Sequence, residues 1–183
     1  LGQIKPALAA ASELQNLLSE EVVRPSADWL ESYYAMKFHV LVRFGMWDEI
    51  ISQEPPKDTE LYCFTTALTY YAKTIAYEAT NLIDEAEGQK ELFFKAIKAV
   101  PETRVLFNNL CIDILAIAAE MLEGEVAYRK KEYNKSFDHL RKAVYLDDGL
   151  PYEEPWGWMQ PVRHALGALL LEQDKIEEAE DVY

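Results

Sequence analysis

Four segments of the chain share one pattern: two helical stretches joined by a short polar turn, with small and large apolar residues at fixed offsets around it. The clearest copy is "GEVAYRKKEYNKSFDHLRKAV", in which Gly124 and Ala127 precede the turn. Tyr133 follows the turn, and Ser136 and Leu140 come next at steps of three and four residues. Such steps place side chains on one face of a helix. The pattern therefore predicts antiparallel pairs of amphipathic helices.

The pattern recurs in three other places. In "LGALLLEQDKIEEAEDVY", Gly167 precedes the turn, and Ile176 and Ala179 follow it at matching offsets. Two degenerate copies are "YAKTIAYEATNLIDEAEGQ" and "MKFHVLVRFGMWDEII". In every copy a large apolar residue stands just after the turn, where it fills the wedge between the two helices. These wedge residues are Trp47, Ile83, Tyr133 and Ile176.

This arrangement resembles the tetratricopeptide repeat, whose motif reads W-x2-L-G-x2-Y, then A-x3-F, then P. In that family a small residue of the first helix, here Gly124 or Gly167, lets the second helix approach closely. The resemblance implies an all-α fold, a right-handed superhelical solenoid of antiparallel helix pairs. The wedge residues lie 36, 50 and 43 positions apart, whereas the family period is about 34. We therefore expect irregular repeats, with sharper curvature or an enlarged pocket.

Because the copies cover most of the chain, we expect a single helical-repeat domain over residues 1–183. Prolines and glycines set the boundaries within it. Strands are not expected, since alternating apolar runs and Asn-Gly turns are absent. Long single helices are expected over 28–44, 59–79 and 102–130. The expected organisation is a preceding helix over 1–24 and helix pairs near 28–52, 59–99, 102–147 and 155–183.

The last pair reaches Tyr183 without a stop signal or a cap. Terminal repeats of a solenoid normally carry a polar outer face, so we expect the parent protein to continue beyond this point. In the isolated chain, Val182 and nearby apolar surface would lack their next neighbour. We therefore expect either weak self-association through this end or a poorly ordered final turn.

The net charge of the chain limits the classes of partner that it can bind. Thirty-two acidic residues against 18 basic ones give a formal charge of −14, which repels nucleic-acid phosphates and anionic membrane surfaces. No uncharged stretch is long enough to span a membrane, and no signal-peptide pattern is present. Cys63 and Cys111 lie in apolar helical patterns and are expected to be buried and reduced. We expect a protein or peptide partner, and a cytoplasmic location is favoured without being fixed.

The sequence contains no motif of catalysis or cofactor binding. His39, His139 and His164 lack companion ligands at metal-binding spacings, and the two cysteines form no C-x-x-C. The seven glycines are scattered singly, so no phosphate-binding loop is expected. These observations favour a non-enzymatic interaction scaffold without metal or cofactor as the leading hypothesis.

In the tetratricopeptide family, the first helix of each pair lines a concave groove in which ligands lie. The resemblance places residues of all four pairs in that groove, and Asn108 and Asn109 would join them if the third long helix begins early. The lysine and asparagine set that binds acidic chaperone tails is absent, so that ligand is not expected. The assigned groove residues are His39, Arg43, Tyr71, Glu78, Met121, Glu125, Tyr128, Arg129 and His164.

The stretch "EEPWGWMQPVRH", residues 153–164, leads into the last pair. One interpretation is a stiff aromatic entry to the final repeat, with Trp156 and Trp158 filling its wall. The other is a wall of the ligand groove, with Arg163 or His164 as the polar contact. If these side chains converge with His39 across the superhelix, the protein is instead a small-molecule binder or an enzyme. A third hypothesis is that the chain is one segment of a longer assembly scaffold.

Overall fold

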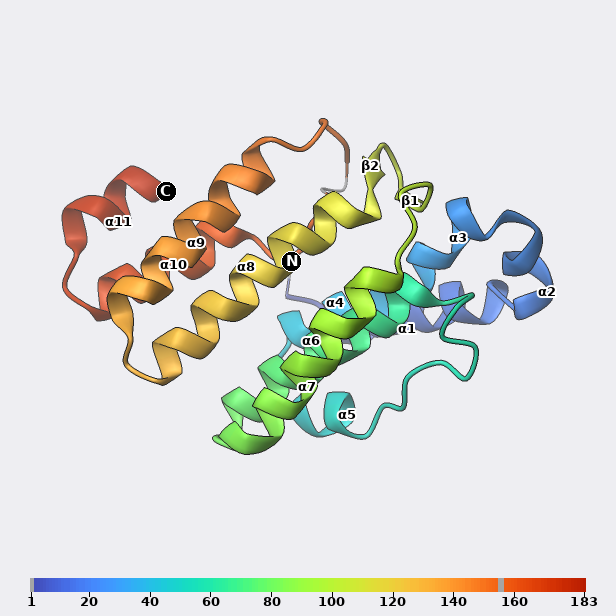
Figure 1. Ribbon diagram of the computed structural model, residues 1–183, viewed down its shortest axis with the longest axis horizontal. Helices are drawn as coiled ribbons and strands as arrows, with labels where there is room; N and C mark the ends of the chain where they lie inside the picture. Colours follow the sequence, from blue (N-terminus) through green and yellow to red (C-terminus); the bar gives the residue numbers. More distant parts are fainter. Residues whose placement is uncertain (1, 155–156) are drawn as a thin grey trace. The chain divides into compact units, whose positions relative to one another are not determined.

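The computed structural model describes residues 2–154 and 157–183, and the chain is almost entirely helical within these ranges (Figure 1). The predicted all-α class is confirmed. Trp156 lies outside the described residues, so its predicted role is not addressed. The chain divides into two compact units, the first ending at Ile112 and the second beginning at Asp113. Each unit has its own buried core.

The first unit contains seven helices, two short 3-10 turns and one two-stranded hairpin among its described residues. These elements are α1 (Ile4–Leu17), α2 (Glu20–Val23), η1 (Arg24–Ser26), α3 (Ala27–Tyr34), α4 (Met36–Arg43), α5 (Trp47–Ile51), α6 (Cys63–Ala79), α7 (Ile83–Ala96), η2 (Ile97–Ala99), β1 (Val105–Leu106) and β2 (Asn109–Leu110).

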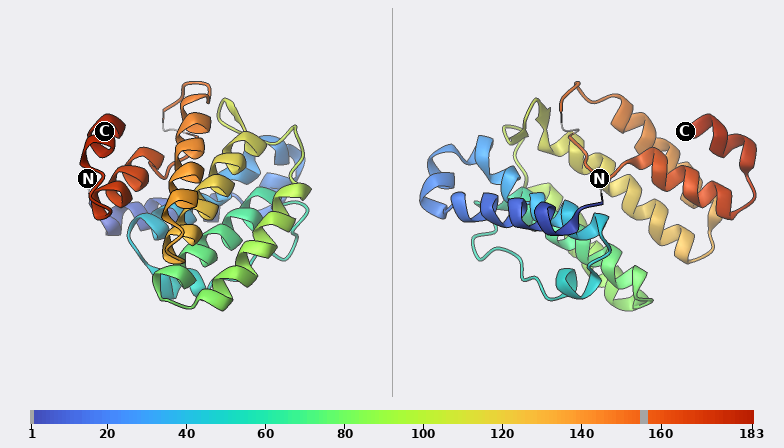
Figure 2. Two further views of the ribbon diagram at one scale, coloured as in Figure 1. Left: turned by 60° about the vertical axis from the view of Figure 1, so that its left-hand side comes forward. Right: turned by 180° about the vertical axis from the view of Figure 1, so that it is seen from behind.

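The centre of the first unit is α6, which is buried along almost its whole length. Its neighbour α7 runs back beside it, and α3, α4 and α5 also pack against it (Figure 1). A cluster of buried side chains from α4, α5 and α6 joins three of these helices, and α1 lies along α4 (Figure 2). The cluster consists of Phe38, Leu41, Ile50, Ala72 and Ala76.

Residues 102–110 do not form the start of the third long helix, as the sequence pattern predicted. The strands β1 and β2 pair antiparallel, with Val105 opposite Leu110, and the expectation of no strand is wrong here. In the turn between them, Phe107 has a positive φ of 51°. The long helix α8 therefore begins only at Cys111, and Asn108 and Asn109 precede it.

Contacts with α3 explain why this segment is extended. The Ser32 hydroxyl donates a 2.7 Å hydrogen bond to the carbonyl oxygen of Val105. The ring of Phe107 meets that of Tyr33 edge-on, with centroids 5.0 Å apart. These interactions join residues more than 70 positions apart, so local helix propensity did not reveal them.

Two other predicted helices are interrupted in the structure. The helix expected over 1–24 is interrupted after α1, where Leu18 turns into the core beside Leu61 and Tyr62. The helix expected over 28–44 is broken for one residue at Ala35, whose carbonyl accepts a hydrogen bond from the Phe38 N–H, three residues on. Such 3-10 steps tighten a helix locally without ending its course.

The second unit consists of two helix pairs. The first pair is α8 (Cys111–Arg129), whose first two residues belong to the first unit, and α9 (Tyr133–Asp148). The second pair is α10 (Val162–Glu172) and α11 (Ile176–Val182) (Figure 2). The last pair was expected to start near 155, but Pro161 precedes α10 with an extended backbone. Proline disfavours helical geometry in the residue before it, which explains the later start.

The core of the second unit lies between α8, α9, α10 and α11. Its buried residues are Tyr128, Phe137, Leu140, Leu166, Leu170 and Ala179, and Val182 packs against them. Val182 is therefore not the unpartnered residue that the sequence predicted. The exposed apolar side chains near this end are instead Leu171, Ile176 and Tyr183.

The four turns between paired helices are built alike. In the first turn, the Gly45 N–H bonds to the Val42 carbonyl at 3.1 Å and the Met46 N–H bonds to the Leu41 carbonyl at 3.0 Å. This pair of bonds closes the last helical turn and defines a Schellman motif. The same two bonds recur in the other three turns. The left-handed residues of the motif are Gly45, Asn81, Lys131 and Asp174, with φ of 62°, 62°, 64° and 55°.

The second helix of each pair begins two residues after the left-handed position. Helices α5, α7, α9 and α11 start at Trp47, Ile83, Tyr133 and Ile176, the four wedge residues of the sequence pattern. The repeated spacing in the sequence therefore corresponds to a repeated turn geometry in the structure.

Close packing of α8 and α9 depends on Gly124. A Cβ atom at this position would lie 2.7 Å from Cγ of Leu140 and 3.2 Å from the carbonyl oxygen of Ser136. Both distances are shorter than ordinary van der Waals contact, and the carbonyl cannot rotate away. The small residue at this position is therefore required by the distance between the two helices.

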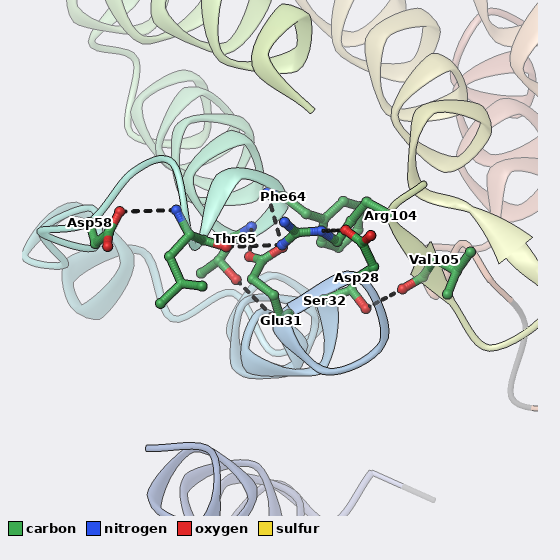
Figure 3. Close-up of polar contacts among 9 residues, drawn as sticks. Asp28, Glu31, Ser32, Asp58, Phe64, Thr65, Arg104 and Val105 are labelled. Carbon is green, nitrogen blue, oxygen red and sulfur yellow. Dashed lines mark hydrogen bonds and ion pairs between the residues drawn. The ribbon is translucent and has the colours of Figure 1, made fainter. Parts of the chain in front are cut away.

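A buried ion pair joins three distant parts of the first unit (Figure 3). Glu31 of α3 is fully buried, and its carboxylate accepts hydrogen bonds from the backbone N–H groups of Phe64 and Thr65 at 3.3 and 2.7 Å. The guanidinium of Arg104 donates to the same carboxylate at 2.9 Å and to Asp28 at 3.2 Å. Burial raises the pKa of Glu31, while the hydrogen bonds from Thr65 and the charge of Arg104 oppose that rise.

Candidate functional site

A candidate site of the second unit is a cleft of about 500 Å³ between the end of α9 and the start of α10. Its walls come from the last residues of α9, residues 150–153 and 157–158, and the first turn of α10. Arg163 and His164, which the sequence assigned to the ligand groove, both line it. The described part of the stretch "EEPWGWMQPVRH" therefore borders a cavity.

Trp158 is a buried lining residue of this cleft. Its side chain is 1% exposed, and its indole N–H lies 2.9 Å from the sulfur of Met121 on α8. Met121 is itself buried. The buried indole therefore contacts the middle of α8 and gives the cleft an aromatic lining residue. The two interpretations of this stretch, structural entry and groove wall, are thus compatible for Trp158.

Arg163 and His164 line the cleft from the first turn of α10. The Arg163 guanidinium donates to the carboxylate of Asp148 at 2.5 Å and to the carbonyl of Val182 at 3.3 Å. The ring of His164 stacks at a tilt on that of Tyr183, with centroids 5.9 Å apart. Both side chains are exposed, so they are accessible to a ligand.

The end of α9 brings two carboxylates into the cleft. Asp147 and Asp148 are the last two residues of this helix, whose final turn contains no basic residue. Burial and the neighbouring charge of Asp148 raise the pKa of Asp147 to about 6, against the opposing charge of Arg163. The helix dipole adds a partial negative charge at this end of α9.

A second cleft of about 430 Å³ lies beside the first. The two share Asp148, Leu150 and Pro151 as lining residues, so they follow one another around the loop after α9. Tyr145 lines the second cleft and Tyr152 lines the first. These two side chains are 77% and 78% exposed, which is unusual for tyrosine in a packed domain.

Some of the groove residues predicted in the first unit are buried and others are exposed. His39, Tyr71 and Glu78 are buried, and the ring of Tyr71 packs against Phe93 at 6.1 Å. Burial lowers the pKa of His39 to about 4, so the imidazole is neutral near pH 7. Arg43 is exposed. Of the two asparagines of the hairpin, Asn108 is exposed and Asn109 is buried.

The remaining predicted groove residues lie on α8. Tyr128 is buried, and its hydroxyl donates to Glu172 at 2.8 Å and accepts from Gln173 at 2.9 Å, both at the end of α10. Its contacts therefore hold the two helix pairs of the second unit together. Glu125 is partly buried, and this raises the pKa of its carboxyl to about 7, whereas Arg129 is exposed.

Sequence reasoning missed the acidic and aromatic residues of the cleft. Asp147, Asp148, Tyr145 and Tyr152 belong to the segment "YLDDGLPYEEP", residues 145–155, most of which lies between the helix pairs predicted near 102–147 and 155–183. The available signal was two aspartates at a helix end, where the dipole disfavours negative charge. The buried pair of Glu31 and Arg104 carried no such signal, because isolated charges are common in amphipathic helices.

The structure holds no evident metal centre in the part of the chain that it describes: no three His, Cys, Asp or Glu side chains are grouped to hold an ion. Cys63 and Cys111 are free and buried, and burial raises the pKa of both thiols. Among the described helices, none is long and apolar enough to cross a membrane.

Comparisons with protein-family models, with curated proteins and with solved structures find no match to this chain. The function must therefore be inferred from its own residues.

Proposed function

We propose that this protein is a non-enzymatic binding scaffold and that the two neighbouring clefts of its second unit hold an extended peptide segment. The observation that carries the proposal is their continuity: the clefts share Asp148, Leu150 and Pro151. We call the pair of clefts the α9–α10 groove. A groove with two successive pockets suits a chain that inserts one side chain into each.

The side chains around the groove support a peptide ligand. Tyr145 and Tyr152 offer large amphipathic surfaces at a small entropic cost, and tyrosine is enriched where proteins bind one another. Trp158 gives a rigid floor. Residues with these properties are typical of the few positions that contribute most of the binding energy.

We further propose that the four helix pairs belong to a right-handed, tetratricopeptide-like superhelix. The support is the identical Schellman motif at four turns, followed each time by a wedge residue. A common turn geometry favours a common crossing angle within pairs, from which solenoids are built.

A second candidate function is the binding of a small molecule. The volume of the first cleft, about 500 Å³, falls in the range of small-molecule sites, and its walls combine aromatic residues with a few charged groups. This candidate uses the first cleft alone, whereas the peptide proposal needs both.

Selection of random dodecapeptides displayed on phage, with the intact chain as bait, tests the peptide proposal. Enriched peptides should lose about tenfold or more in affinity with Tyr145→Ala and with Tyr152→Ala, measured by calorimetry. The matched control is Trp29→Ala, which removes an exposed aromatic ring from the first unit. If no peptide is enriched, or if the control weakens binding as much as the groove variants do, the proposal is wrong. Loss with Tyr152→Ala alone favours the small-molecule candidate.

A further inference from the structure

The walls of the α9–α10 groove carry an uneven charge. Its acidic lining residues are Asp113, Asp147, Asp148 and Glu153, and its only basic ones among the described residues are Arg163 and His164. Arg163 already pairs with Asp148 at 2.5 Å. Two of the four acidic residues, Asp147 and Asp148, are the last residues of α9, and Asp148 lines both clefts.

Asp147 is the least satisfied of these carboxylates. It is half-buried at the end of α9, and its carboxylate receives no hydrogen bond from the described side chains or backbone. Asp148 repels it, and the negative end of a 16-residue helix lies beside it. Helices normally place lysine or arginine in this position, and α9 has none in its last turn. The folded protein therefore holds a carboxylate whose charged form an added cation would stabilise.

The surrounding side chains suit a cation on an aliphatic stem. Tyr152 lies in the same cleft as Asp147, and Tyr145 lies one helical turn before Asp148 on α9. Tyrosine rings bind the methylene groups of lysine and arginine and attract their charged heads. Combining a carboxylate, a helix C-terminus and two exposed rings selects an ammonium or guanidinium group over a neutral one.

From this geometry we infer that the α9–α10 groove binds a basic peptide segment, with a lysine or arginine side chain docked against Asp147. This inference rests on the proposed function and adds the chemical class of the ligand. In this arrangement Arg163 opposes ligand binding and does not contact the ligand favourably. Its exposed ion pair with Asp148 is of the weak kind, and it competes with the incoming cation for the same carboxylates.

The probe is acetylated and amidated hexalysine carrying a fluorescent dye, with anisotropy measured at about 0.15 M salt to screen long-range attraction. The competitors are the same peptide with every lysine acetylated and a hexaglutamate of equal length. The double variant Asp147→Asn/Asp148→Asn should weaken binding of hexalysine by about tenfold or more. The matched control is Glu177→Gln/Asp181→Asn on α11, which removes the same formal charge from exposed positions of the same unit. The control should change binding less than about twofold.

Arg163→Gln gives the sharpest result, because it should tighten hexalysine binding several-fold. Equal losses in the groove and control variants, or weaker binding with Arg163→Gln, would overturn the inference. If the acetylated peptide competes as well as hexalysine, the groove binds peptides without selecting cations, and the proposed function survives alone. If phage selection and hexalysine both show no binding at the groove, the proposed function fails as well. Circular dichroism spectra that match those of the unchanged protein establish that each variant is folded.

Discussion

Glu31 accepts a 2.7 Å hydrogen bond from the backbone N–H of Thr65, 34 residues later in the chain. Thr65 lies in the first turn of α6, whose own N-cap residue, Tyr62, makes no side-chain hydrogen bond to the helix. The first N–H groups of a helix have no partner within it and need an acceptor from elsewhere. A carboxylate from α3 supplies that acceptor, and Arg104 balances its charge.

Replacing Glu31 with alanine should therefore destabilise the protein strongly. The change leaves Arg104 buried without the carboxylate of Glu31. It also leaves the first N–H groups of α6 without a hydrogen-bond acceptor. We expect a loss of about 3–5 kcal/mol in the free energy of unfolding, measured by urea denaturation. Glu20→Ala removes a carboxylate from an exposed pair with Arg24 and should cost less than about 1 kcal/mol. Similar losses for the two variants would mean that the buried network contributes no more than a surface pair.

Alanine at three glycines should have three different effects. Gly124→Ala forces a Cβ to within 2.7 Å of Leu140 and should destabilise the protein by about 1–3 kcal/mol. Gly88→Ala lies in the exposed middle of α7 with no atom within 4 Å, so it should stabilise by about 0.5–1 kcal/mol. At Gly167 the three atoms nearest to an added Cβ all belong to the exposed ring of Tyr183, which can move aside, so the effect of Gly167→Ala should be small. Thermal melts of the three variants check this order, and a stable Gly124→Ala protein would contradict the close approach of α8 and α9.

The Schellman turns predict a stabilising substitution. Lys131 holds a left-handed backbone conformation with φ of 64°, where the equivalent residue of the first turn is Gly45. A residue with a Cβ pays about 1–2 kcal/mol to adopt this conformation. Lys131→Gly should recover part of that energy, about 0.5–1 kcal/mol, and raise the melting temperature. The reverse change, Gly45→Lys, should lower it. No shift in either variant would show that the turn does not constrain the backbone.

Asp147 should make stability depend on pH. Its folded pKa of about 6 lies above the ordinary value of 3.8, so the folded state binds more protons than the unfolded state between these values. Stability from this group is present below pH 3.8 and is lost as the pH rises through about 6. Asp147→Asn removes this dependence and should therefore stabilise the protein by about 1–2 kcal/mol at pH 7, after allowance for partial exposure.

The same variant should match the unchanged protein near pH 4, where Asp147 is protonated in the folded state. Denaturation curves at both pH values measure the difference. Asp181→Asn is the control, because this aspartate is exposed on α11. If Asp147→Asn stabilises the protein by the same amount at pH 7 and at pH 4, then the charge of Asp147 does not destabilise the folded state.

The sequence by itself determined the helix pairs and the position of each turn within them. Trp47, Ile83, Tyr133 and Ile176 were assigned from spacing alone, and each begins a second helix in the structure. This was possible because a helical face and a Schellman turn involve residues only a few positions apart. Their signals, steps of three and four residues and a polar turn, are therefore contained in short windows of sequence.

Only the tertiary structure decided the hairpin over 105–110, the pairing of Glu31 with Arg104 and the shape of the α9–α10 groove. Each depends on contacts between distant segments, such as Ser32 with Val105 across 73 positions. A helical pattern gives the face of a residue but not the neighbour that covers it, so buried residues such as His39, Tyr71 and Tyr128 were assigned to a groove. The groove itself is formed by two helix ends and a loop, and the pKa of Asp147 is raised chiefly because the fold buries this carboxyl.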